Sequence, residues 1–488
     1  MYTDMVYLIE SIVKEFPMKN LNLSEDQAVY EAALAFINAY FNYTTDAPAR
    51  SVAPDETIAY FANQTFSKEG RSVDAVVQEL LTDVYPHILK QDHTRAFGFI
   101  PGPASKLSWL GDVMTQAFNV HASNWINSSS ASTIEENVIQ WLAQQIGFTG
   151  KAGGVFVSGG SMANLTGVIA GRDKILSEDN RHLGVVYLSD QTHHSVEKAL
   201  YIIGYTRKQL RFVPTNNAFQ MDVHQLQTMI EQDLSNGLVP TTIIASAGTT
   251  NTGTVDPLHG IADIAASYGI WLHVDGAYGA SFLLSTTQRH HLAGIERADS
   301  VSWDAHKLLF QTYSCAMIIV KDKQDLLNSF SATPEYLQDI DGGSVDFSSL
   351  GIELTRPARA LKLWLTLQVL GTDEFSRRVD YGQTLAELGE LTLSTMENWE
   401  IVSHAHFAII NFRYNHPNYS KEENDALNAS IAKSIVDSGF AGVFTTELKS
   451  KTVVRMCSTN PATSEHDIIS TLNRLNTYAQ EYVAAHSA

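Results

Sequence analysis

The feature that most constrains the fold of this chain is an alternation of short β-branched runs with longer helical patterns, which begins near Pro86. Strands that alternate with helices indicate α/β units, whose crossover connections make neighbouring strands parallel. We therefore predict an α/β fold with a mostly parallel central sheet. The predicted strands are Val155–Val157, Gly184–Leu188, Thr242–Ser246, Ile270–Val274, Ser300–Ser302 and Ala316–Val320.

Two other regions flank this alternation. Helical periodicity over Tyr2–Phe16 and Asp26–Phe41 predicts a helical N-terminal segment. After a helical pattern at Ala358–Leu370, alternating and helical segments mix again. We predict an N-terminal helical segment (residues 1–85), a large α/β domain (residues 86–370) and a smaller C-terminal α/β domain (residues 371–488).

Charge and cysteine content narrow the classes of partner. Acidic residues outnumber basic ones by 53 to 33, so the formal net charge is -20 and the surface repels nucleic acids and anionic lipids. Cys315 and Cys457 are too few for a disulfide framework, which fits a reducing compartment. The sequence shows neither a signal-peptide pattern at Met1–Phe16 nor an apolar run of roughly 18 residues. We expect a cytoplasmic protein without nucleic-acid or membrane partners.

A glycine-rich turn follows the first predicted strand and opens a helical pattern. Its sequence is Gly159-Gly160-Ser161-Met162-Ala163-Asn164. Unpaired N–H groups and the positive end of the helix dipole make such a turn a site for anions. The turn lacks the lysine ending of a nucleotide P-loop and the full glycine spacing of dinucleotide-binding proteins. The anion could therefore be any phosphate, or none.

Three chemically versatile side chains, Asp275, His193 and Lys307, each follow a predicted strand. Ligands of open α/β sheets bind at the carboxyl ends of the strands, so we expect these side chains near one site. Each also has an ordinary structural explanation. Asp275 could cap a helix, His193 could start one, and Lys307 could lie on the surface with its amine in solvent.

The functional alternatives for these side chains are more specific. Asp275 could bind a metal or pair with the protonated nitrogen of a heterocycle, and His193 could stack on such a ring. The amine of Lys307 could serve as a nucleophile if apolar neighbours shelter it. No second cluster with the spacing of metal ligands accompanies Asp275, so we predict no metal site.

Taken together, these segments resemble the group II amino-acid decarboxylases that use pyridoxal 5′-phosphate (PLP), which include aromatic L-amino-acid, glutamate and histidine decarboxylases. The resemblance spans roughly residues 85–370, and its motifs look most like those of bacterial aromatic decarboxylases, tryptophan decarboxylases especially. It implies the fold type I architecture, like aspartate aminotransferase, and a homodimer with active sites at the interface. The motifs that carry it are His93–Pro103 (HTRAFGFIPGP), Gly159–Asn164 (GGSMAN) and Glu353–Arg359 (ELTRPAR).

The same resemblance implies a role for each motif residue. Lys307 would carry PLP as a Schiff base, Asp275 would pair with the pyridine nitrogen, and His193 would stack on the ring. Many relatives carry a hydroxyl residue in place of Ala163, and an asparagine or serine in place of Asp304. The other implied cofactor contacts are Ser161 and the amides of Met162 and Ala163 for the phosphate, with Thr250, Ala277, Asp304 and His306 nearby.

The segment Thr333–Leu337 (TPEYL) resembles a mobile loop of the same family, whose Pro-x-Tyr-Leu pattern closes over the active site. The resemblance implies that Tyr336 is the acid that protonates the substrate carbon after carbon dioxide leaves. A buried aromatic anchor is the alternative. The polar stretch after Tyr336, with two adjacent glycines, favours a loop that moves.

The expected substrate wall is aromatic and apolar, which suits tryptophan, tyrosine, phenylalanine or dihydroxyphenylalanine and yields tryptamine or a similar arylalkylamine. Three alternatives stay open: a decarboxylase of non-aromatic amino acids, a PLP aldehyde synthase or transaminase, and an inactive regulatory protein of this fold. Tyr336 argues against an aldehyde synthase, since relatives that shift to oxidation often carry phenylalanine there. The wall residues are Phe97, Phe99, Ile100, Pro101, His121 and Trp125, with Phe347, Leu350 and Gly351 from a second subunit.

Overall fold

The computed structural model describes residues 23–42, 48–331 and 346–486. The chain forms two compact units, Met1–Lys90 and Gln91–Ala488. The predicted helix Asp26–Phe41 is confirmed as part of α2, whereas Tyr2–Phe16 lies outside the described residues. The helices of the first unit are α2 (Leu23–Phe41), α3 (Asp55–Asn63) and α4 (Val73–Glu79), with a π-helical turn η1 (Leu80–Val84).

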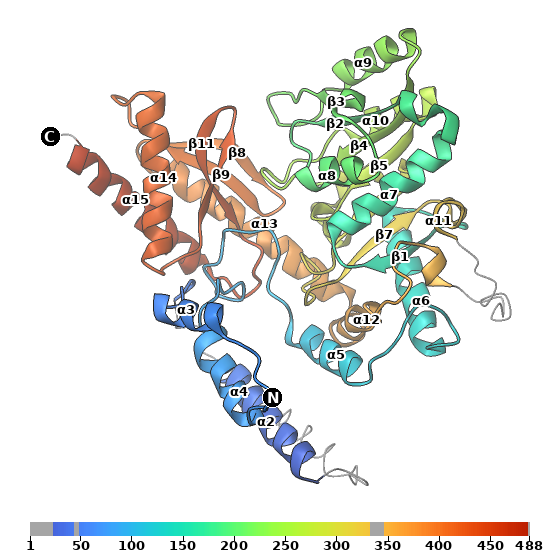
Figure 1. The fold of residues 1–488 in the computed structure, drawn as a ribbon. Helices are drawn as coiled ribbons and strands as arrows, with labels where there is room; N and C mark the ends of the chain where they lie inside the picture. The colour runs from blue at the N-terminus through green and yellow to red at the C-terminus, as the bar shows by residue number, and fades with distance from the viewer. Residues whose placement is uncertain (1–22, 43–47, 332–345, 487–488) are drawn as a thin grey trace. The chain divides into compact units, whose positions relative to one another are not determined.

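A seven-stranded sheet of order β1-β7-β6-β5-β4-β2-β3 lies at the centre of the second unit (Figure 1). Strands β2 to β6 pair in parallel, and β7 runs antiparallel to its neighbours β1 and β6. The predicted mostly parallel α/β sheet is therefore confirmed. The strands are β1 (Gly153–Val157), β2 (Gly184–Ser189), β3 (Leu210–Val213), β4 (Val239–Ser246), β5 (Trp271–Asp275), β6 (Ser300–Trp303) and β7 (Ala316–Val320).

Helices cover both faces of this sheet, because successive strand residues point to opposite sides. In β1, Phe156 packs with the cluster that includes α6, α9 and α10, whereas Val155 and Val157 pack toward α7 and α11. The helices of this part are α5 (Lys106–Ala117), α6 (Ser129–Ile146), α7 (Gly160–Ile175), α8 (His194–Ile202), α9 (Val223–Ser235), α10 (Leu258–Tyr268), α11 (Lys323–Phe330) and α12 (Ala360–Leu370).

The C-terminal part contains a four-stranded antiparallel sheet of order β10-β11-β9-β8 (Figure 1). Helix α13 joins the two sheets' cores: Phe375 and Val379 pack with the large cluster, and Leu385 and Leu393 with the small one. The predicted domain boundaries at residues 86 and 371 stay predictions. The elements are α13 (Thr372–Ser394), β8 (Trp399–His406), β9 (Ile409–Tyr414), α14 (Lys421–Asp437), β10 (Phe444–Leu448), β11 (Lys451–Cys457) and α15 (Glu465–His486).

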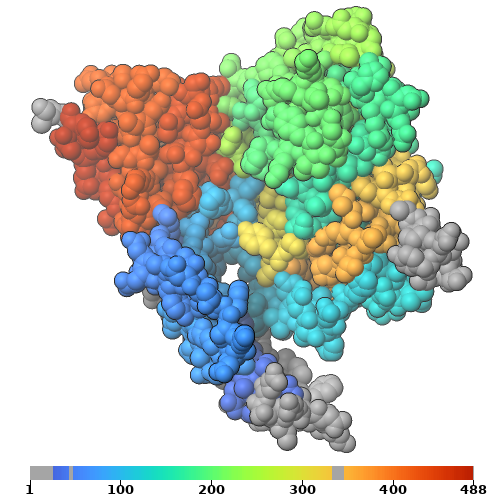
Figure 2. All heavy atoms as spheres, in the orientation of Figure 1, coloured from blue at the N-terminus to red at the C-terminus, as the bar shows by residue number. Residues whose placement is uncertain are grey.

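The four-stranded sheet holds the loop that follows β4. Asn411 donates to the carbonyl of Asn251 at 2.9 Å, and His406 Nδ1 donates to the carbonyl of Gly253 at 2.8 Å. Figure 2 shows the orange C-terminal residues in contact with the green residues of the large sheet's region. The loop after β4 is thereby fixed at the carboxyl end of the parallel strands.

Acidification is expected to destabilise the folded protein through His406. Burial lowers the pKa of His406 to about 4, so the folded state keeps this ring neutral while the unfolded state protonates it near its usual value of 6.5. A depressed histidine pKa makes stability fall as the pH drops from about 6.5 to 4, by up to about 3 kcal/mol for this group.

The variant His406→Asn tests this expectation, because the asparagine amide can still donate to the Gly253 carbonyl. We expect the drop in thermal midpoint between pH 6.5 and 4.5 to be smaller in the variant than in the wild type. An unchanged pH dependence would show that His406 takes no part in it. Asp256, whose pKa burial raises to about 6, acts with the opposite sign in both proteins and cancels in the comparison.

Candidate active site

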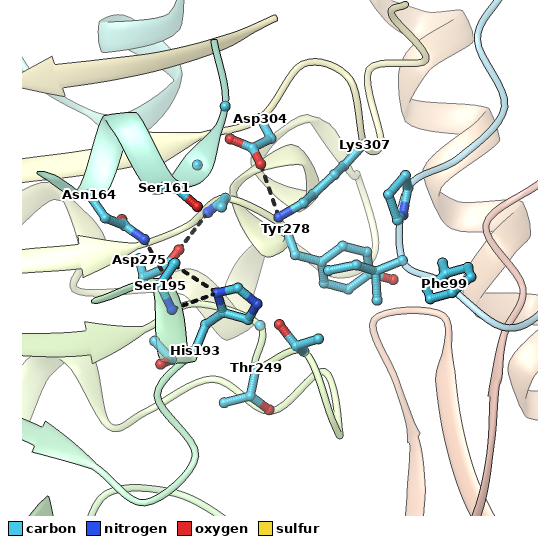
Figure 3. A pocket seen from close by; sticks show the side chains of 18 of the residues that line it. Phe99, Ser161, Asn164, His193, Ser195, Thr249, Asp275, Tyr278, Asp304 and Lys307 are labelled. Atoms are coloured by element: carbon cyan, nitrogen blue, oxygen red, sulfur yellow. Dashed lines mark hydrogen bonds and ion pairs between the residues drawn. The ribbon is translucent and has the colours of Figure 1, made fainter. Parts of the chain in front are cut away.

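A cavity of about 360 Å³ lies at the carboxyl ends of the parallel strands, where ligands of open α/β sheets bind. It is lined by residues of the large sheet's loops together with one residue of β11 (Figure 3). Its lining comprises Phe99, Ile100, Pro101, Gly159, Gly160, Ser161, Asn164, Gln191, His193, Ser195, Ser246, Gly248, Thr249, Thr250, Asp275, Ala277, Tyr278, Asp304, His306, Lys307 and Arg455.

Lys307 and Asp304 form an ion pair at the wall of the cavity, with 3.0 Å between Lys307 Nζ and Asp304 Oδ2 (Figure 3). Asp304 is buried, and its Oδ1 has no hydrogen-bond partner in the described part of the chain. His306 Nδ1 accepts the N–H of Cys315, so its Nε2 carries the proton and lies 3.4 Å from Asp304 Oδ2. Burial lowers the pKa of His306, which keeps the ring neutral.

The glycine-rich turn forms an anion cradle at the start of α7. A Cβ at Gly160 would lie 2.8 Å from Asp304 Oδ2, so only glycine permits this close approach. The structure does not bring two of the predicted phosphate donors to the cavity: the amides of Met162 and Ala163 donate to the carbonyl of Gly159, at 2.9 and 3.0 Å, and neither residue lines the cavity. The donors left for an anion are the amides of Gly160 and Ser161 and the hydroxyl of Ser161.

Asp275 presents a carboxylate whose orientation is set by hydrogen bonds. Its Oδ2 accepts from Asn164 Nδ2 at 2.9 Å, and its Oδ1 accepts from the amide of Ala277 at 3.1 Å and from Ser302 Oγ at 3.2 Å. These three donors hold the carboxylate in one orientation. The site therefore holds a fixed negative charge at the end of β5 (Figure 3).

His193 is the N-cap of α8, where its Nδ1 accepts the amide N–H of Ser195 at 3.3 Å and lies 2.8 Å from Ser195 Oγ. Burial lowers the pKa of His193, although the charge of Asp275 opposes this shift. The ring is therefore neutral near pH 7 and carries its proton on Nε2. Its position beside the cavity is suited to stacking on a flat ligand (Figure 3).

These groups fit PLP. A lysine amine faces the cavity, the Gly160 and Ser161 amides form a cradle for a phosphate, and the Asp275 carboxylate can pair with a protonated ring nitrogen. The cavity has the size usual for small cofactors. Together with the mostly parallel seven-stranded sheet, this arrangement defines the class of PLP-dependent enzymes of fold type I.

Comparison with known proteins narrows this class. The family model described as the pyridoxal-dependent decarboxylase conserved domain matches residues 54–415. The chain therefore belongs to the pyridoxal-dependent decarboxylase family, and it is a PLP-dependent carboxy-lyase that acts on an amino acid. This result confirms the predicted family, cofactor and fold class.

Individual relatives differ in substrate. An aromatic-L-amino-acid decarboxylase of Bacillus atrophaeus is 36% identical over 470 residues, which cover 95% of this chain and 98% of the relative. An L-2,4-diaminobutyrate decarboxylase of Acinetobacter baumannii is 30% identical, covering 82% and 83%. A phenylacetaldehyde synthase of Petunia hybrida is 31% identical, covering 83% and 84%. The structure of an Oryza sativa TDC with PLP and tryptamine has a TM-score of 0.89 at 27% identity and covers 96% of this chain and 100% of that chain.

The structure brings most of the predicted cofactor residues to one cavity and separates most of the predicted substrate wall from it. Phe97 is buried in the core of the four-stranded sheet, and Phe347 and Leu350 are buried against β1 and β7. These three side chains are enclosed in the cores of this chain, so the structure does not bring them to the cavity. The predicted residues that do line the cavity are Phe99, Ile100, Pro101, Ser161, His193, Thr250, Asp275, Ala277, Asp304, His306 and Lys307.

Two further predicted residues, His121 and Trp125, are not among the cavity lining of the described residues. His121 Nε2 lies 2.7 Å from Ser123 Oγ, and Trp125 is 45% exposed. Neither lines the cavity. Tyr336 lies outside the described residues.

Sequence reasoning missed Arg455, whose guanidinium donates to the carbonyls of Thr250 and Gly98, both at 2.9 Å. Arg455 belongs to β11 and carries no motif, so no local signal could have placed it on the cavity. Asn164 was also unassigned, although its place in the glycine-rich motif is a signal. In the described residues, no group of three or more His, Cys, Asp or Glu side chains is arranged to hold a metal, and none of the helices is long and apolar enough to cross a membrane.

Proposed function

We propose that this protein decarboxylates an aromatic L-amino acid, namely tryptophan, phenylalanine, tyrosine or dihydroxyphenylalanine, to the arylalkylamine and carbon dioxide. The observation that carries this proposal is the apolar side of the cavity, which consists of Phe99, Ile100 and Pro101. The ring of Phe99 is 46% exposed and lies 5.2 Å from that of Phe444, so an aromatic surface faces the opening. An aromatic side chain gains most from such a surface.

The cavity has few positive charges for an acidic side chain. Its lysine and arginine are Lys307 and Arg455, and each already has partners in the described residues. Lys307 pairs with Asp304, and Arg455 donates to two backbone carbonyls. Lys307 is thereby neutralised, and Arg455, which uses two of its five N–H donors, is the one cation of the described lining that a side-chain carboxylate could reach.

The roles of the site residues follow from their positions. PLP, when bound, withdraws electrons from the bond to the carboxylate carbon, so that carbon dioxide can leave. Lys307 would hold the cofactor covalently, and Asp275 would keep the ring nitrogen protonated through its fixed charge. Gly160 and Ser161 would bind the phosphate. The neutral ring of His193 would stack on the cofactor ring and set the tilt of that ring. Apolar residues around the substrate would exclude water.

The substitution Tyr336→Phe tests the final protonation. Tyr336 matches the family's tyrosine in sequence, and we propose that its hydroxyl delivers the proton to the substrate carbon. We expect the variant to bind PLP as the wild type does but to form less amine per carbon dioxide released, with dissolved dioxygen and water consumed to give aldehyde, ammonia and hydrogen peroxide as new products. Mass spectrometry of the products measures this ratio. Equal amine yield in both proteins would remove the acid role of Tyr336.

The experiment that tests the proposed function is carbon dioxide release by PLP-loaded protein from each of the twenty amino acids and from dihydroxyphenylalanine. We expect release with aromatic substrates, and mass spectrometry should identify the matching amines. Release from glutamate, aspartate, diaminobutyrate or a basic amino acid alone would keep the decarboxylase and refute the aromatic substrate. Stoichiometric hydrogen peroxide and ammonia from the wild type would instead indicate an aldehyde synthase.

We also propose a homodimer. Two segments, one around His121 and one around Pro357, are joined by an isolated β-bridge between these two residues, and both segments expose apolar side chains. Phe118, Ile126 and Leu354 are 80%, 59% and 62% exposed. Exposed apolar side chains that gather in this way mark an interaction surface. A second copy on this surface could bring the segment of His121 and Trp125 to its partner's site.

Sedimentation of the double variant Ile126→Asp, Leu354→Asp tests the dimer. We expect a dimer for the wild type and a monomer for this variant, because charges cannot be buried in an apolar interface. Leu391→Asp is the control, since Leu391 is 65% exposed on α13, away from these segments. A wild-type monomer with full activity would refute the proposal.

A further inference from the structure

A buried row of polar side chains extends from Asp275 into the core between α7 and the sheet. Trp271, His273 and Asp275 alternate along β5 and therefore point to the same face of the sheet, toward α7. In the register of β5 with β6, His273 lies opposite Ser300 and Asp275 lies opposite Ser302. His273 and Ser300 are fully buried, and Asn164 of α7 is 1% exposed. Side chains this deeply buried need hydrogen-bond partners.

The hydrogen bonds of this row form one continuous chain. Asn164 Nδ2 donates to Asp275 Oδ2 at 2.9 Å, and Asn164 Oδ1 lies 2.9 Å from His273 Nε2. His273 Nδ1 lies 2.8 Å from Ser300 Oγ, which accepts from Trp271 Nε1 at 3.0 Å. Asn164 and His273 each use one polar atom for the bond on one side and the other polar atom for the bond on the other side. No polar atom in the row is left without a partner.

The direction of every bond follows from the charge at one end. An ionised Asp275 only accepts hydrogen bonds, so the amide nitrogen of Asn164 must face it and the amide oxygen must face His273. Burial lowers the pKa of His273, so the ring is neutral and carries one proton. That proton must be on Nε2, because Asn164 Oδ1 can only accept. Ser300 must then donate to Nδ1, and Trp271 donates to Ser300.

The helix is shaped to admit these rings. A Cβ at Gly167 would lie 2.7 Å from the imidazole of His273, and a Cβ at Gly171 would lie 2.6 Å from the indole of Trp271. The two glycines are four residues apart, so they lie on the same face of α7. Each costs about 1 kcal/mol of helix stability relative to alanine. Both glycines lie on the face of α7 that contacts the rings of His273 and Trp271.

We infer that His273 and Asn164 are positioning residues that hold Asp275 in the orientation needed to pair with the ring nitrogen of PLP. Hydrogen bonds that share a direction polarise one another, so each donor in the row strengthens the next toward the carboxylate. The inference rests on the proposed role of Asp275. It extends the site by three residues, His273, Ser300 and Trp271, which lie outside the cavity lining.

The test compares two cofactors on the full-length, cofactor-free protein. The probes are PLP and its analogue in which CH replaces the ring nitrogen, which cannot pair with Asp275. The ratio of their dissociation constants, measured by absorbance titration, isolates the pairing from general effects on folding or on the phosphate site. Asp275→Asn should abolish most of the wild-type preference for PLP.

His273→Asn and His273→Gln form a matched pair. The asparagine amide can replace Nδ1, which accepts from Ser300, and the glutamine amide can replace Nε2, which donates to Asn164. We expect His273→Asn to reduce the preference for PLP up to about tenfold, the upper end of the usual value of a hydrogen bond between neutral groups, and His273→Gln to keep most of it. Thermal midpoints of both variants should fall by similar amounts, because both leave space in the core.

A second variant makes the test independent of residue 273. Asn164→Asp is nearly isosteric but offers Asp275 an acceptor in place of a donor. The preference of this variant for PLP should therefore fall at least as far as that of His273→Asn. If His273→Asn and Asn164→Asp keep the wild-type ratio while Asp275→Asn loses it, Asp275 acts without the row and the inference is overturned. If Asp275→Asn also keeps the ratio, the proposed pairing fails together with the inference.

Discussion

Replacing Lys307 with alanine is expected to abolish turnover, with a loss on the order of 10⁴-fold or more, as for the removal of other covalent nucleophiles. The amine of Lys307 lies on the cavity, 3.0 Å from Asp304, in the position to bind the cofactor covalently. Alanine removes both the covalent link and the cation that pairs with the buried carboxylate. We expect the variant to bind PLP more weakly and without the absorbance of the covalent form.

Lys307→Arg separates the two losses, because arginine keeps the positive charge beside Asp304 but cannot form the covalent link. Turnover should be as low in this variant as in Lys307→Ala. Borohydride reduction followed by peptide mass spectrometry should find the cofactor on the Lys307 peptide of the wild type and on no peptide of the variants. Cofactor on another lysine of the wild type would contradict the assignment.

Asp275→Asn is expected to lower kcat about a hundredfold to a thousandfold, the usual effect of removing one fixed electrostatic contact to the reacting system. Asparagine is nearly the same size but carries no charge, so the ring nitrogen of the cofactor would lose its proton and withdraw electrons less strongly. The amide nitrogen of the new side chain would also face a donor, either Asn164 Nδ2 or Ser302 Oγ, depending on the orientation of the amide. Steady-state kinetics and the absorbance of bound PLP measure the two effects.

Asp299→Asn is the matched control for this substitution. Asp299 accepts the N–H of Leu272 at 2.8 Å. It lies just before the start of β6 and beside the start of β5, which is the opposite end of these strands from the cavity. The same chemical change there should alter stability and leave kcat within about twofold, as expected for a site outside the catalytic groups. An equal loss of kcat in both variants would show that the effect of Asp275→Asn is structural.

The strands of the large sheet were largely predictable, and the exceptions share a physical cause. The six predicted runs all form strands, because strands that are buried along their length are continuous apolar segments. The strands β3 and β10 were not predicted. Each lies at the edge of its sheet and carries exposed or polar side chains, such as Arg211 in β3 and Glu447 in β10. Strands with such side chains lack the continuous apolar pattern of a buried strand, whereas β1, an edge strand that is buried throughout, has it and was predicted.

The sequence by itself determined the class of chemistry. Ser161, His193, Asp275 and Lys307 each lie within a few residues of a strand end, and the carboxyl ends of parallel strands meet at one edge of a sheet. Local order along the chain was therefore enough to predict that these side chains share one site. The roles assigned to them remain predictions that the variants above test.

Only the tertiary structure decided which side chains surround that site. Phe97 and Phe99 are two residues apart in one motif, yet Phe97 packs into the core of the four-stranded sheet and Phe99 faces the cavity. Arg455 reaches the cavity from β11, and His273 meets Asn164 across the interface of β5 and α7. These contacts join residues that are far apart in the chain, and their geometry depends on how sheets and helices pack. No local pattern encodes such packing, whereas the strand ends that carry the chemistry are encoded locally.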